Sequence, residues 1–90
     1  MAFQAGDFVG VVCEVQPGPF SDERLVTLDT IDGPISGFVK DTELRVNSGK
    51  WEVRGKVQEV RAGTLKVLIF GSFFTTNGTA HISTSLAMVA

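Results

Sequence analysis

Apolar and polar residues alternate along much of the chain, with the period of two that is typical of β-strands. The clearest example is a pair of runs, 55–60 and 65–70, which face each other across Arg61-Ala62-Gly63. The second run is rich in β-branched and aromatic residues, and Gly63 supplies the left-handed residue that a short loop needs. The pattern therefore predicts a β-hairpin, around which the rest of the chain is organised.

Further strands follow from the same alternation on both sides of this hairpin. In the run 51–57, Trp51, Val53 and Val57 share one face, which we expect to be buried. No stretch keeps a helical period, and only 41–44 and 83–86 have the length of a single helical turn. The predicted fold is all-β with at most single helical turns. Expected strands cover 6–15, 24–30, 35–39, 51–57, 65–70, 72–76 paired with 79–82, and 87–89, with a loop at 16–23 and a turn at 31–34.

The two halves of the sequence resemble each other. Gly10 and Val12 in the first half correspond to Gly55 and Val57 in the second. We therefore expect one domain, 1–90, with pseudo-repeats over 6–46 and 51–90 and a linker at 47–50. They would form either one small barrel or two packed β units of about 40 residues. A chance likeness between β sequences is the alternative.

Composition places the chain among folded globular proteins. It is 43% hydrophobic and 20% charged, which excludes a disordered tail. No apolar run approaches the ~20 residues of a membrane-spanning helix, and no basic residue precedes an apolar block at the start. The single cysteine, Cys13, cannot form an internal disulfide. We expect a soluble, unexported, cytoplasmic protein with no membrane contact.

Charge is unevenly distributed along the sequence. The net charge is −2 and the pI is near 5.2, so the chain as a whole lacks the basic character of most phosphate binders. Residues 1–45 carry eight acids and three bases, a charge of −5, whereas residues 46–90 carry five bases and two acids, a charge of +3. This asymmetry favours contact with an acidic partner on one side, or attraction between copies. The alternative is charge scattered over solvated strand faces.

Candidate catalytic chemistry is sparse. His81 is the only histidine, and no spacing brings it to a nucleophile and an orienting carboxylate. Cys13 lies in an apolar strand, where a small core residue is expected. No glycine loop opens a helix, and metal-ligand spacing is absent. We expect no enzymatic activity, no cofactor and no metal.

Two sets of residues are candidates for binding. Phe73 and Phe74 are adjacent in a turn-rich segment, so a regular strand would expose one of them, and Phe20 lies in the loop 16–23. An exposed phenylalanine would anchor a protein partner or another copy, unless it seals the barrel end. The second set is basic and aromatic and would suit single-stranded nucleic acid, although alternation favours a core position for its tryptophan. It comprises Trp51, Arg54, Lys56, Arg61 and Lys66.

The central hairpin also carries a family resemblance. Gly55-Lys56-Val57, Leu65-Lys66-Val67 and Ile69-Phe70-Gly71 resemble the KOW motif of the transcription elongation factor NusG, an SH3-like barrel. The opening Gly6-Asp7 and the segment Gly18-Pro19-Phe20 look like other parts of that family. Ser72 replaces the family's arginine, and 73–78 reads as an insertion, which puts the family's ribosomal and termination-factor contacts in doubt. The segment 33–39 also resembles the end of an S1-type RNA-binding barrel.

Two hypotheses follow from the sequence. The first is a non-enzymatic β-barrel module that acts through protein contacts, as an adaptor or as a self-assembling subunit that forms homo-oligomers. The alternative is an RNA or single-stranded nucleic-acid binding module of the KOW or S1 type.

Overall fold

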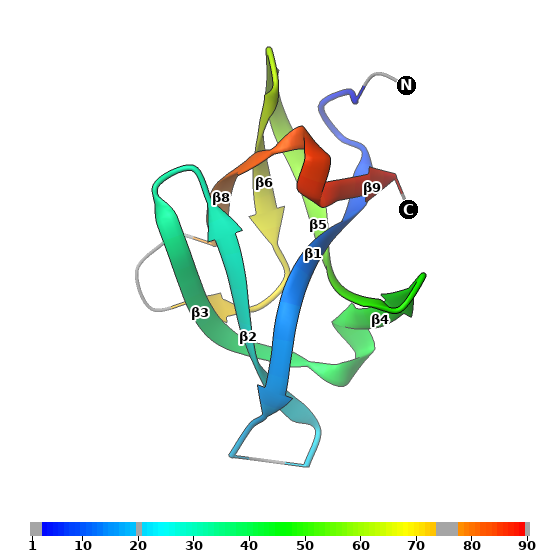
Figure 1. Ribbon diagram of the computed structural model, residues 1–90, viewed down its shortest axis with the longest axis vertical. Helices are drawn as coiled ribbons and strands as arrows, with labels where there is room; N and C mark the ends of the chain where they lie inside the picture. The colour runs from blue at the N-terminus through cyan, green and yellow to red at the C-terminus, as the bar shows by residue number, and fades with distance from the viewer. Residues whose placement is uncertain (1–2, 20, 74–77, 90) are drawn as a thin grey trace.

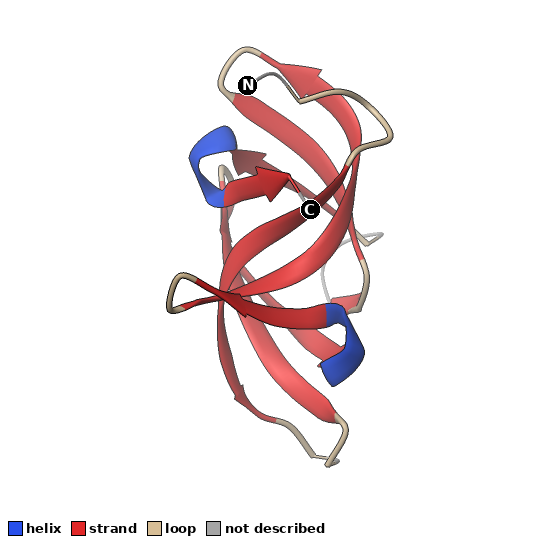
Figure 2. Ribbon diagram, turned by 90° about the vertical axis from the view of Figure 1, so that its right-hand side faces the viewer, coloured by secondary structure: helices blue, strands red, loops and turns tan. Residues whose placement is uncertain are grey.

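The computed structural model describes residues 3–19, 21–73 and 78–89, which form one antiparallel sheet curled into a half-barrel (Figures 1 and 2). The expected all-β fold is confirmed, and so are the two single turns, which are both 3₁₀. The strands are β1 (Phe8–Pro17), β2 (Glu23–Thr30), β3 (Gly33–Lys40), β4 (Leu44–Asn47), β5 (Lys50–Arg61), β6 (Thr64–Ile69), β7 (Ser72–Phe73), β8 (Thr79–Ser83) and β9 (Ala87–Val89), and the 3₁₀ turns are η1 (Asp41–Glu43) and η2 (Thr84–Leu86).

The sheet is centred on β1 and β5, the two longest strands. Its order is β7-β3-β2-β1-β5-β6-β8, with β4 added beside β5 and β9 beside β1. β1 pairs with β5 through Phe8–Cys13 and with β2 through Glu14–Pro17. It therefore joins the part of the sheet that contains β5 to the part that contains β2. Figure 1 shows β1 and β5 side by side, with β2 and β3 on the left. The concave side holds the core.

The core is formed by the inward-facing side chains, which occur at every second residue along the strands. Val9, Val11, Val26, Val53, Val67 and Ile82 are completely buried, and Leu28, Val39, Val57 and Leu65 nearly so. The β-branched residues that set the alternation in the sequence are thus the residues that the curled sheet encloses.

The central hairpin is confirmed by β5 and β6. Arg61 pairs with Thr64, so Ala62 and Gly63 alone make the turn, and Gly63 has the positive φ of 76° that the sequence predicts there. The register shifts between Val57 and Glu59, a β-bulge that sharpens the curl of the sheet.

The expected linker at 47–50 is instead a tight turn. Asn47 pairs with Lys50, which joins β4 and β5 in a hairpin, and both Ser48 (φ 52°) and Gly49 (φ 79°) are left-handed. Positive φ at both central residues matches the right-handed twist of the flanking strands. The segment expected as a linker is thus a two-residue hairpin turn, a role that a Ser-Gly pair serves well.

The expected pairing of 72–76 with 79–82 is wrong for Ser72 and Phe73, and residues 74–76 lie outside the described part of the chain. β7 pairs with β3, and β8 pairs with β6. Phe73 is consequently turned inward and is only 8% exposed. Its ring occupies the space left by Gly37, where a Cβ would lie 2.6 Å from ring atoms. Tertiary pairing across the barrel therefore overrides the local hairpin signal in this segment.

The predicted burial of Trp51 fails at the end of β5. Trp51 is 39% exposed, whereas its neighbour Glu52, expected on the solvent face, is 2% exposed. Trp51 lies beside the hairpin turn, at the end of the sheet, next to the exposed Val46 on β4. Glu52 is covered because Arg45 of β4 lies against its carboxylate.

Leu65→Ala should lower the free energy of unfolding by about 2–5 kcal/mol, because it leaves a cavity in the enclosed core. Its cross-strand neighbour Val60 is 42% exposed, so Val60→Ala should cost only about 0.5 kcal/mol. Chemical denaturation of the two variants measures both values. Equal losses would contradict the enclosure of Leu65, since the two paired side chains share one face of the sheet and differ only in burial.

Candidate binding surface

The convex face of β1, β5, β6 and β8 carries the side chains that point away from the core. Phe8, Lys56, Leu68 and Thr79 form one row across these four strands, because each pairs with the next in register. Phe8 is 42% exposed and Lys56 is exposed, whereas Leu68 and Thr79 are half-buried. The row places an aromatic ring, a cation and an apolar side chain next to one another on an open sheet face.

An arginine stacked on two rings extends this row. The Phe8 and Phe70 rings have centroids 6.3 Å apart and planes inclined by 25°. The Arg54 guanidinium carbon lies 4.7 Å from the Phe8 centroid and 5.3 Å from the Phe70 centroid, and Lys56 Nζ lies 5.8 Å from Phe8. These are cation–π distances, which place Arg54 over both rings and Lys56 over Phe8. We call Phe8, Arg54, Lys56 and Phe70 the aromatic-basic cluster.

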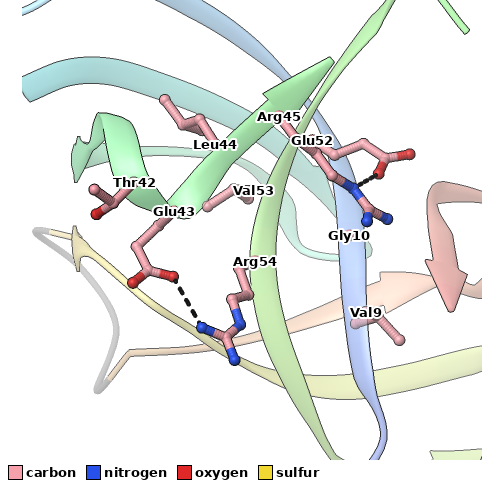
Figure 3. Close-up of a pocket in the computed structure, with 9 residues that line it drawn as sticks. All are labelled: Val9, Gly10, Thr42, Glu43, Leu44, Arg45, Glu52, Val53 and Arg54. Carbon is pink, nitrogen blue, oxygen red and sulfur yellow. Dashed lines mark hydrogen bonds and ion pairs between the residues drawn. The ribbon is translucent and has the colours of Figure 1, made fainter. Parts of the chain in front are cut away.

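Arg54 also forms one wall of a pocket of about 160 Å³ (Figure 3). Its Nη1 is 3.8 Å from Glu43 Oε2, which is close enough for an ion pair but too long for a hydrogen bond. Glu43 Oε2 is buried and has no hydrogen-bond partner among the described residues. Arg54 is therefore held loosely by its carboxylate and remains 52% exposed.

A tighter pair closes the far side of the same pocket (Figure 3). Arg45 Nε donates a hydrogen bond of 2.8 Å to Glu52 Oε1, and the Glu52 side chain is 3% exposed. Gly10 leaves the room for this carboxylate, since a Cβ at that position would overlap Oε1. The buried carboxylate has a dedicated partner, so we assign this pair a structural role.

The residues predicted for nucleic-acid binding do not all lie together. Arg54, Lys56 and Lys66 occupy outward positions of β5 and β6 on the convex face. Arg61 lies at the tip of the hairpin, where it bonds Glu59. Trp51 is on the opposite face of β5, by the alternation that buries Val53 and Val57. Arg61 alternates with Glu59, the register partner of Lys66, so it shares the convex face, and four of the five predicted residues lie there while Trp51 does not.

Phe8 and Phe70 were missed by the sequence analysis. The sequence analysis includes Phe8 only within the strand expected over 6–15, and Phe70 only as part of the central hairpin. The signal for Phe8 was present, because Val9 and Val11 alternate with it and fix the inward face. Phe70 follows the end of β6, so only the backbone bond from Phe70 N to Arg54 O places its ring beside the arginine.

Basic residues continue along the convex face beyond the cluster. Lys66 lies between Glu59 and His81 in register, and Arg61 is next to Glu59. The hydrogen bond and charge of Arg61 lower the pKa of Glu59, and Lys66 and His81 act in the same direction. Glu59 is thus a single carboxylate among three bases, and the face stays basic around it.

The phenylalanines predicted as partner anchors are not supported as a group. Phe73 is buried, as described above, so it cannot anchor a partner. Phe20 and Phe74 lie outside the described residues. Among described residues, the large apolar side chains that are exposed are Phe8, Ile31, Val46, Trp51, Val60, Met88 and Val89.

Catalytic groups are not assembled in the part of the chain that the structure describes. Burial, and secondarily the charge of Glu52, raises the pKa of the Cys13 thiol to about 12, so this cysteine stays protonated at neutral pH. His81 is exposed on β8. No group of three or more potential metal ligands occurs among the described residues. In the same residues, no helix has the length and apolar character needed to cross a bilayer.

Comparison with protein-family models, curated proteins and solved structures found no match to this chain. The resemblance to the KOW motif therefore rests on the short segments named above, whereas the small β-barrel-like architecture stands on the structure itself.

Arg45→Ala should lower the free energy of unfolding by about 1–3 kcal/mol, because it leaves the buried Glu52 carboxylate without its hydrogen-bond partner. In a Glu52→Gln background the same change should cost clearly less, giving a coupling of about 0.5–3 kcal/mol in a double-mutant cycle. The Arg24–Asp41 pair has the same 2.8 Å length but side chains 39% and 46% exposed. Arg24→Ala is therefore the control, and it should lower the free energy of unfolding by at most about 1 kcal/mol. Equal costs at both arginines would contradict the structural role.

Proposed function

We propose that this protein is a non-enzymatic module that binds single-stranded nucleic acid on its convex face. The observation that carries the proposal is the aromatic-basic cluster, in which the Arg54 guanidinium stacks on the Phe8 and Phe70 rings beside Lys56. Single-strand binders combine aromatic platforms for bases with cations that follow the backbone. Both elements are present here on one open sheet face.

The cations of this cluster are available to phosphates. No carboxylate of the described residues lies within 4.0 Å of the Lys56 ammonium, and Arg54 has only the 3.8 Å contact with Glu43. A phosphate can therefore approach Lys56 without breaking an ion pair, and Arg54 would exchange a long contact for a bidentate one.

The overall acidity of the chain does not oppose this assignment. The acids that make the net charge −2 are concentrated in residues 1–45. Those within β1–β3 and η1 are Glu14, Glu23, Asp29, Asp41 and Glu43, and of these five only Glu43 lies within 4.0 Å of a cluster cation. The second half, whose charge is +3, supplies β5, β6 and β8 of the convex face. An anionic strand is thus attracted to one side of the molecule and repelled from the other.

The sheet geometry favours a single strand over a duplex. Neighbouring β-strands are ~4.8 Å apart, so a row across β1, β5 and β6 offers a flat platform about the size of one or two bases. A base stacked on an aromatic side chain contributes ~1–3 kcal/mol whatever its sequence. Duplex bases are already stacked on one another, and they would gain nothing from Phe8.

Labelled single-stranded dT or U oligomers of about 12 nucleotides should bind, with a log–log salt slope near −2 if three phosphates are neutralised. Phe8→Ala should weaken binding roughly 5- to 150-fold, and Lys56→Ala should reduce the slope by about 0.7. Fluorescence anisotropy over a range of salt concentrations measures both quantities.

The matched control is Lys50→Ala, which removes an exposed lysine from the same strand but far from the cluster. It should leave affinity and slope unchanged. The proposal would be contradicted if no binding occurred at low salt, or if Lys50→Ala and Lys56→Ala changed the affinity and the salt slope equally.

A second candidate function is self-association, as a subunit that contacts another copy. It is favoured by Val46 and Trp51, a cross-strand pair that is 57% and 39% exposed. Within the described part of the chain, β4 pairs only with β5, so its outer edge is open beside this apolar pair. An open strand edge next to an exposed tryptophan is suited to pairing with the same edge of a second copy.

Self-association through this edge predicts that the mass in solution rises with concentration. Trp51→Ser should abolish the rise, because it removes the largest apolar side chain of the edge. Ile31→Ser, at a residue 55% exposed on the β2–β3 turn, should leave it intact. Light scattering after size exclusion measures the mass, and a monomer at all concentrations rules this candidate out.

A further inference from the structure

The two halves of the chain contain corresponding elements in the same order, and the second half has one additional strand, β7, between β6 and β8, which pairs with β3. Each begins with a long strand, β1 or β5, and adds two further strands, β2 and β3 or β6 and β8. Each then makes a 3₁₀ turn, η1 or η2, and ends in a short strand. The short strands cross over: β4 of the first half pairs with β5, and β9 of the second half pairs with β1.

The pairing registers of the two halves agree at the centre. β4 begins its pairing at Leu44 with Val53, and β9 likewise begins its pairing at Ala87 with Val11. Leu44 and Ala87 are each the first residue after their 3₁₀ turn. Val11 and Val53 in turn pair with each other. The four residues form one row in the order Leu44, Val53, Val11, Ala87. The row is symmetric about its centre, between Val53 and Val11.

The pairing registers also agree farther from the centre, in the strands that follow β1 and in those that follow β5. Val15 pairs with Val26 as Val57 pairs with Val67, and Thr27 pairs with Ser36 as Leu68 pairs with Thr79. Val26 and Val67 are both completely buried. This correspondence matches Val11 with Val53, so it is displaced from the Gly10–Gly55 alignment that the sequence suggests. A pseudo-two-fold axis between Val11 and Val53 accounts for every one of these pairs.

Neither half can complete its own sheet. Without β5 and β9, the buried residues Val9 and Val11 of β1 would lose their neighbours on both sides. Without β1 and β4, Val53 would lose its neighbours in the same way. The surface that each half offers is complementary to the other half, and the same surface would fit that half in another molecule.

The covalent junction between the halves is short and strained. It consists of Ser48 and Gly49, both with positive φ, and Ser48 is the one non-glycine residue with positive φ among those described. A serine in this conformation costs free energy that a glycine would not. Short strained hinges favour exchange of elements between copies.

We propose that the two halves are equivalent units of an internal dimer, and that a second copy of this chain can supply either half. The interface is the β1–β5 centre with its crossed strands β4 and β9. Two chains then exchange halves, so that each β-barrel unit contains residues 8–47 of one chain and 50–89 of the other. This proposal does not depend on nucleic-acid binding.

Deletion of Ser48 and Gly49 tests the exchange, because strands joined without a turn cannot fold back on each other. The variant is made in a Trp51→Ser background, which removes the edge contact proposed above. Light scattering should show about twice the monomer mass with the native circular dichroism spectrum. Ser48→Gly in the same background keeps the turn, relieves the strain and should be a monomer. A folded monomer of the shortened chain overturns the proposal.

Complementation between full-length chains gives a second test, which remains valid if the shortened chain misfolds. Val26→Asp and Val67→Asp bury a charge in the first and the second half respectively, and each variant alone should be largely unfolded. Refolded together, they can form a unit from two intact halves, so roughly half of the native signal should return. Val26→Asp mixed with Leu28→Asp, both in the first half, is the control and should recover nothing. Recovery no greater than the control overturns the proposal.

Discussion

The structure depends on the antiparallel ladder between β1 and β5. Six consecutive residue pairs, from Phe8 with Lys56 to Cys13 with Trp51, hold the two longest strands together. Because neighbouring side chains point to opposite sides, this one ladder buries Val9, Val11 and Val53 in the core and turns Phe8, Arg54 and Lys56 outward. The core and the proposed binding surface are therefore the two faces of the same pairing, and a one-residue slip would exchange them.

The same ladder explains how the cations are presented. An arginine and a lysine on alternate positions of one strand would ordinarily be mobile, but the pairing partner of Lys56 is Phe8, and the chain returns after β6 to place Phe70 beside Arg54. Stacking on two rings limits where the guanidinium can lie, which would lower the entropy lost in the proposed contact with a phosphate. The buried Arg45–Glu52 pair secures β4 against β5 nearby without competing for these cations.

Much of the fold could be predicted from alternation and turn chemistry, as the β5–β6 hairpin and both 3₁₀ turns show. Failures came where two distant segments decide the outcome. The sequence predicts a local hairpin over 72–82, yet β7 pairs with β3, where Gly37 leaves space for the Phe73 ring. Trp51 is apolar and correctly phased, yet it is exposed because the sheet ends beside it. For the binding surface, three basic residues could be placed on one face by counting along β5 and β6.

By itself, the sequence determined which residues of each strand share a face, since that follows from the two-residue period and the position of glycines in turns. It also determined the opposite charges of the two halves. Only the tertiary structure decided which strands lie side by side, and hence that Phe8 and Phe70 meet at Arg54 and that β4 and β9 cross between halves. The physical reason is that strand pairing joins backbone groups of every residue type alike, so its partner is selected by the packing of the whole core.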